Sequence, residues 1–136
     1  MKKLATAFAI ILATTGAAKA NGFDGIASQA ALDMSAADQI YNSCPNCGSS
    51  FLAYNEVQLG YYTMVAAQYA STAFNEIGSD AYAGDKLTAY NNLSTAGYYR
   101  SLLAETQPTD NTEITIFNDE WHNYQVLNDT MNAYLP

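Results

Sequence analysis

Four stretches of the chain carry apolar residues at intervals of three and four, and helix-breaking residues separate them. The stretches cover about residues 21–42, 49–78, 85–105 and 111–134. Such spacing places apolar side chains on one face of a helix, and short connections favour antiparallel neighbours. The sequence therefore predicts an all-α fold, a small antiparallel bundle of about four helices in two helical hairpins, forming one domain over 21–136.

The same spacing predicts which side chains face the core. For 85–105 the predicted inner residues are Leu87, Tyr90, Leu93, Ala96 and Leu103. For 49–78 they are Phe51, Tyr54, Val57, Tyr61, Met64, Val65, Gln68 and Tyr69. For 111–134 they are Phe117, Trp121, Tyr124, Leu127, Met131 and Tyr134.

Polar residues at the starts of these stretches predict helix caps. Asn21 is a candidate N-cap for the first helix, and Ser49 or Ser50 for the second. Asp110 followed by Glu113 is typical of a capping box at the start of the fourth.

The first 20 residues have the pattern of a secretory signal peptide. Two lysines precede a short apolar run from Leu4 to Ala13, and Ala18-Lys19-Ala20 matches an A-x-A cleavage site. The run is shorter than the roughly 20 apolar residues that span a bilayer. We therefore expect bacterial Sec export with cleavage after Ala20, a periplasmic or secreted location, and no membrane span in the mature chain.

Charge narrows the classes of partner. After cleavage, the chain would keep two basic residues, Lys86 and Arg100, and 13 acidic residues, which gives a formal net charge of −11. Two cations cannot form a phosphate-binding face, so nucleic acid is not expected as a partner. Acidic surface supplies solubility and electrostatically favours a basic partner.

Cys44-Pro45-Asn46-Cys47 is the motif with the most chemical content. In an oxidising compartment, an even cysteine count favours a structural Cys44–Cys47 disulfide. Cys-Pro-x-Cys before a helix also resembles the motif of disulfide oxidoreductases, which implies Cys44 as nucleophile and Cys47 as resolving thiol. Cys44, Cys47 and His122 form a third candidate, an incomplete metal site.

His122, the sole histidine, follows Asp119 and Glu120. Because it lies off the predicted inner stripe of its helix, we interpret it as an exposed residue paired with acid. Tyr61-Tyr62 and Tyr98-Tyr99 are adjacent pairs, and helical neighbours point about 100° apart, so one ring of each pair faces outward. Tyr62 and Tyr99 are therefore candidate interface residues.

No nucleophile triad, phosphate-binding loop or dinucleotide motif occurs in the sequence. We therefore predict a non-enzymatic protein that binds another protein, as an accessory subunit, inhibitor or immunity-type protein, with no cofactor. The alternatives are a Cys-x-x-Cys thiol–disulfide oxidoreductase and a carrier of a small ligand or metal.

Overall fold

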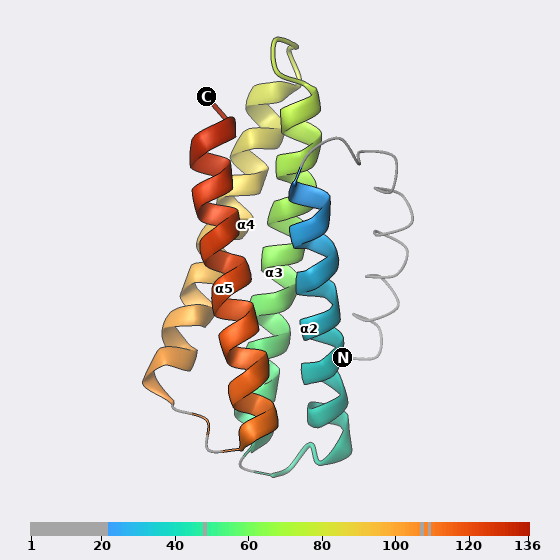
Figure 1. Ribbon diagram of the computed structural model, residues 1–136, viewed down its shortest axis with the longest axis vertical. Coiled ribbons are helices and arrows are strands. Elements are labelled where there is room, and N and C mark those ends of the chain that lie inside the picture. Colours follow the sequence, from blue (N-terminus) through green and yellow to red (C-terminus); the bar gives the residue numbers. More distant parts are fainter. Residues whose placement is uncertain (1–21, 48, 107, 109) are drawn as a thin grey trace.

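The computed structural model describes residues 22–136, apart from residues 48, 107 and 109 and the side chain of Ser49. Within that part the chain forms four helices: α2 (Phe23–Ser43), α3 (Ser49–Asn75), α4 (Tyr82–Glu105) and α5 (Asn111–Tyr134). The helices alternate in direction as in an antiparallel bundle (Figure 1). The prediction of a small all-α bundle is confirmed; the predicted signal peptide lies outside the described residues.

Helix α3 is the centre of the bundle. It packs extensively against α2 on one side and α4 on the other, whereas α5 contacts the remaining helices over a much smaller surface. Figure 1 shows α5 running alongside the other helices, against the layer that α2, α3 and α4 form. One face of this layer is therefore covered by α5.

Alanine dominates the core. The fully buried apolar positions of α2 and α3 are mainly small, and a few larger residues on the other helices complete the packing. Small side chains allow helix axes to approach closely, but they leave little room for rings. The main core cluster comprises Phe23, Ala27, Ala30, Ala31, Met64, Ala66, Ala67, Ala70, Ala73, Ala89, Leu93, Leu127, Met131 and Leu135.

This core corrects the prediction for α3 and α4. Val57, Met64 and Gln68 are buried as predicted, but Phe51, Tyr54 and Tyr69 are exposed. In α4, Leu93, Ala96 and Leu103 are buried, whereas Leu87 is 62% exposed. The helical period was predicted correctly. The buried face, however, is formed mainly by small residues, and several aromatic residues predicted to be buried are exposed.

In the first half of α5 the buried residues precede the predicted ones by one position. Its buried residues are Glu113, Ile116, Glu120, Asn123, Leu127 and Met131. Leu127 and Met131 agree with the prediction, but Phe117, Trp121 and Tyr124 are only partly buried and Tyr134 is exposed. In the first half of the helix this shift buries Ile116, Glu120 and Asn123 in place of the expected aromatic rings.

Helix ends follow the predicted breakers with small shifts. α3 ends at Asn75, and Gly78 adopts a positive φ of 93° in the turn beyond it, a conformation that glycine tolerates best. α4 begins at Tyr82, so Gly84 lies inside its first turn. The cap position of α2 is Gly22, without a side-chain cap, while Asn21 lies outside the described residues.

The predicted capping box at the start of α5 is confirmed in part. Asp110 accepts hydrogen bonds from the backbone N–H groups of Thr112 (2.9 Å) and Glu113 (3.3 Å). The Glu113 side chain, however, is buried and its Oε1 has no hydrogen-bond partner, so it does not complete a capping box. At the start of α3, the Ser50 hydroxyl donates back to the Cys47 carbonyl at 2.6 Å and does not cap the helix.

None of the helices in the described part of the chain combines the length and apolar character needed to cross a bilayer.

Gly60 marks the tightest contact between α2, α3 and α5. A Cβ at this position would lie 2.9 Å from the Met34 Cβ, 3.2 Å from the Ala30 carbonyl oxygen and 2.9 Å from Oε1 of Glu120. Two of these atoms are fixed on α2, so a methyl group would push the helices apart. We expect Gly60→Ala to lower the free energy of unfolding by about 1–3 kcal/mol, measured by urea denaturation.

Gly25→Ala is the matched control, because no neighbouring atom lies within 4 Å of its would-be Cβ. Alanine favours helix over glycine by up to about 1 kcal/mol, so this variant should be slightly stabilised. Equal stability of the two variants would contradict the tight contact at Gly60.

Candidate functional site

The structure brings both predicted interface tyrosines together. Tyr62 of α3 and Tyr99 of α4 stack with ring centroids 5.8 Å apart and an interplanar angle of 6°. Both rings are partly buried. Stacking in this geometry stabilises an aromatic pair beyond the area that it buries.

Four further tyrosines extend this pair across three helices. Tyr61 lies edge-on to Tyr62 at 5.1 Å, and Tyr98 lies edge-on to Tyr99 at 5.2 Å. Tyr54 interacts with Tyr99 electrostatically and packs at 6.2 Å against Tyr41 of α2. We call this set the tyrosine face; it comprises Tyr41, Tyr54, Tyr61, Tyr62, Tyr98 and Tyr99.

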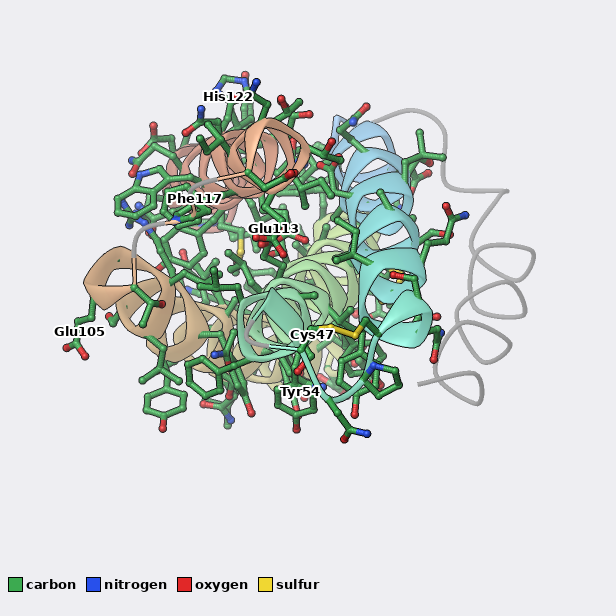
Figure 2. The ribbon with its side chains drawn as sticks, turned by 90° about the horizontal axis from the view of Figure 1, so that it is seen from below. Cys47, Tyr54, Glu105, Glu113, Phe117 and His122 are labelled. Carbon is green, nitrogen blue, oxygen red and sulfur yellow. A yellow bond between two sulfur atoms is a disulfide. The ribbon has the colours of Figure 1, made fainter. Side chains whose placement is uncertain are left out.

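The tyrosine face is open to solvent. Tyr98 is 60% exposed and Tyr54 is 39% exposed, and Phe51, one turn before Tyr54, is 55% exposed. Figure 2 shows Tyr54 pointing away from α5, on the side of α3 that α5 leaves uncovered. Burial, followed by the neighbouring hydroxyls of Tyr54, Tyr62 and Tyr98, raises the pKa of Tyr99, so its hydroxyl stays protonated and able to donate.

Charge is scarce on α3 and on the middle of α4, which carry most of this face. The 27 residues of α3 include a single charged residue, Glu56, and that side chain is fully buried. In α4 no charged residue occurs between Lys86 and Arg100. The exposed side of α3 therefore presents rings and neutral polar groups.

A second feature, which sequence analysis missed, is a cluster of carboxyl groups inside the bundle. We call it the carboxyl cluster: Asp33 of α2, Glu56 of α3, and Glu113 and Glu120 of α5, none more than 6% exposed. Figure 2 shows Glu113 directed into the space between α5, α3 and α2. Glu113 and Glu120 are seven residues apart, which places both on one face of a helix. This spacing is the sequence signal that could have indicated that the two carboxyl groups lie together.

Burial changes the protonation of these groups. It raises the pKa of Glu56 to about 8, with Glu113 nearby adding to the effect. Burial also raises the pKa of Glu120 well above its ordinary value, helped by Glu56, Asp33 and Asp119. For Asp33 burial and then Asp119 raise the pKa to about 6, although hydrogen bonds from Gln29 and Asn123 oppose the rise. Glu56 therefore keeps its proton at neutral pH, whereas Asp33 titrates near pH 6.

A pocket of about 350 Å³ lies between the end of α4 and the first half of α5. Its lining is mostly apolar: Leu103, Ala104, Pro108, Ile114, Phe117, Asn118 and Trp121. Beside it, the Arg100 guanidinium lies 3.9 Å from the centre of the Trp121 ring and 4.9 Å from that of Tyr124. This cation–π contact links α4 to α5 at the edge of the pocket.

The cysteines form the predicted disulfide. Cys44 and Cys47 are bonded, with Cα atoms 5.5 Å apart, in the connection between α2 and α3. Cys44 is the C-cap residue of α2. The predicted pairing of Cys44 with Cys47 is confirmed, and the structural role of the bond stays a prediction.

The candidate metal residues do not come together. His122 is exposed and points outward from α5, while Cys47 lies near the α2–α3 connection (Figure 2). Across the described part of the chain, no three side chains of His, Cys, Asp or Glu are arranged to hold a metal ion.

The disulfide closes a loop of four residues, so it removes little entropy from the unfolded chain. We expect Cys44→Ser with Cys47→Ser to preserve the helical circular dichroism and to cost at most about 2 kcal/mol of stability. Loss of the fold would instead show that the disulfide is essential to the α2–α3 connection.

Comparison with family models, curated proteins and solved structures finds no match to this chain.

Proposed function

We propose that this chain is an exported, acidic, non-enzymatic protein that acts by binding another protein, with the tyrosine face as its contact surface. A role as an accessory subunit, inhibitor or immunity-type protein fits this description. The observation that carries the proposal is the gathering of six tyrosines from three helices on a side of the bundle whose central helix exposes no charge.

The composition of the tyrosine face matches that of interface centres. Such centres are enriched in aromatic residues and depleted of charged ones, and tyrosine supplies contact area at low cost in side-chain entropy. The stacked Tyr62–Tyr99 pair also holds its rings in place before binding. A pre-ordered surface loses less entropy on association.

Charge elsewhere on the molecule bears on the choice of partner. Asp119 and Asp129 are exposed on α5, away from the tyrosine face. A basic partner would be steered by the acidic surface during approach, while the final contact is made by rings and hydroxyls. We infer a partner with an apolar, hydrogen-bonding contact patch bordered by basic residues.

Site-specific photo-crosslinking tests this proposal. A photoreactive phenylalanine analogue in place of Tyr98 should crosslink to one discrete protein in an extract of the producing cells. The same analogue at Gln125, which is exposed on α5, should not give that product. Identical patterns from both positions would contradict the proposal.

The captured protein then allows an affinity measurement. Tyr54→Ala combined with Tyr98→Ala should weaken its binding at least about tenfold, because truncating a central tyrosine commonly costs more than 1 kcal/mol. Gln125→Ala should leave the affinity unchanged. Light scattering on the isolated protein distinguishes a partner of another sequence from a second copy of this chain.

The pocket beside Trp121 favours a second candidate function, carriage of a small apolar ligand. Ligand sites commonly have volumes of 300 Å³ or more, with mostly apolar walls and few polar groups. The pocket reaches the low end of that range, and Asn118 supplies an amide.

Anilinonaphthalene sulfonate, an apolar anionic dye, can probe this pocket. We expect saturable binding at one site, detected by energy transfer from Trp121, the only tryptophan. Ala104→Phe should abolish it by filling the pocket, whereas Ala133→Phe, exposed at the far end of α5, should not. Binding that survives Ala104→Phe would remove this candidate.

A further inference from the structure

The carboxyl cluster lies between α5 and the rest of the bundle. Glu113 and Glu120 occupy the inner stripe in the first half of α5, whereas Leu127 and Met131 continue that stripe in the second half. The first half of α5 is therefore seated through two acidic groups and Ile116, whereas the second half is seated through apolar packing. Glu56 of α3 and Asp33 of α2 are the facing members of the cluster.

The cluster is poorly compensated. Both carboxyl oxygens of Glu56 and of Glu120, and Oε1 of Glu113, are buried without a hydrogen-bond partner. Asp33 is the exception, since its Oδ2 accepts from Nδ2 of Asn123 at 2.7 Å. Burying an ionised carboxylate without a partner costs several kcal/mol, whereas the neutral acid is tolerated far better.

No cationic side chain of the described residues is seen to pair with these carboxyl groups. In the described ranges the residues that can carry positive charge are Lys86, Arg100 and His122. Lys86 donates to the Pro136 carbonyl oxygen at the other end of the bundle, and Arg100, the only such group on the adjoining part of α4, stacks on Trp121. His122 is exposed on the outer side of α5.

The other nearby titratable groups are acids, which oppose ionisation. Asp119 lies close enough to raise the pKa values of Asp33 and Glu120, and Asp110 does the same for Glu113. Asp38 of α2 is also buried, and its Oδ2 accepts from Asn42 at 3.1 Å. Each proton lost from the cluster thus makes the next loss harder.

Glu120 is fitted closely into the bundle. Its Oε1 lies 2.9 Å from where a Cβ of Gly60 would stand. The carboxyl group therefore occupies space that only glycine leaves free at this position of α3. An ionised group here cannot reach water unless α5 moves.

We propose that the carboxyl cluster is a proton-dependent latch, in which neutral Asp33, Glu56, Glu113 and Glu120 keep the first half of α5 seated and their ionisation releases it. The latch acts on α5 because that helix has the smallest contact with the rest of the bundle. Its release would withdraw Ile116 of α5 from Met34 of α2 and Val57 of α3, against which it packs, and would expose these apolar side chains. This inference is independent of the proposed partner.

The direction of the pH effect follows from proton binding. Because the folded state holds these protons to higher pH than the unfolded chain does, it binds more protons between about pH 4.5 and 8. Stability is then greatest near pH 5 and falls as pH rises through this window. Each carboxyl group that titrates changes the unfolding constant about tenfold per pH unit.

Urea denaturation at pH 5 and pH 8 tests the latch on the full protein. The unfolding constant should rise at least tenfold between these values for the wild type. Glu56→Gln and Glu120→Gln, which keep the shape and remove the titration, should each reduce that rise and unfold at higher urea than the wild type at pH 8. Glu105→Gln, exposed at the end of α4, should keep the full rise.

Hydrogen exchange locates the change, and it remains informative if a variant fails to fold. Amides of residues 111–123 should lose protection in the wild type at pH 8 before those of α3, after correction for intrinsic exchange rates. Equal stability at the two pH values, or uniform loss of protection, would overturn the proposal. Restoration of stability at pH 8 by Ca²⁺ or Mn²⁺ would also overturn it, because a metal ion would then be the ligand.

Discussion

Close packing of small residues between α2 and α3 is the constraint on which the remaining structure depends. Alanine lines both helices where they meet, and Gly60 brings α3 within contact of the Met34 Cβ and the Ala30 carbonyl oxygen. An interior this narrow has no room for most of the chain's aromatic rings. The tyrosines are consequently placed at the borders and on the outer side of the bundle, where their hydroxyls meet water.

Two features that matter for function follow from that packing. On the open side of α3, the displaced rings contact one another and form the tyrosine face. On the covered side, the space between α5 and the other helices is filled partly by carboxyl groups, of which Glu120 depends on the missing side chain at Gly60. We infer that one side of the bundle binds a partner and that the other responds to protons.

The fold was predictable to a large extent because helix number and helix ends depend on local signals. Pro108, Gly78 and the Asp110 cap all act within a few residues of their own positions. The pairing of Cys44 with Cys47 was predictable for a similar reason, since the chain holds no other cysteine. Helical geometry predicted one outward ring in each tyrosine pair, but in the second pair the exposed ring is Tyr98, while Tyr99 is partly buried. The stacking of Tyr62 on Tyr99 depends on how α3 and α4 align.

The orientation of each helix face was harder to predict. Phe51 and Tyr54 lie on a stripe that hydrophobicity alone assigns to the core, but in this part of α3 the buried side chains are those of Ala53 and Val57. Glu113 was predicted to complete a capping box, and nothing local indicates that Glu120 is buried, because a carboxyl group enters a core only when neighbouring helices enclose it. Tertiary packing, which no local pattern encodes, thus decided both candidate sites.

Tyrosine nitration with mass spectrometry can show whether the rings excluded from the small-residue core serve as a binding surface, as we propose. In the isolated protein, Tyr54, Tyr98 and Tyr134 are all exposed and should react. In the complex recovered from producing cells, Tyr54 and Tyr98 should be protected, whereas Tyr134, on α5, should react as before. Equal reactivity of all three tyrosines in both samples would contradict the claim.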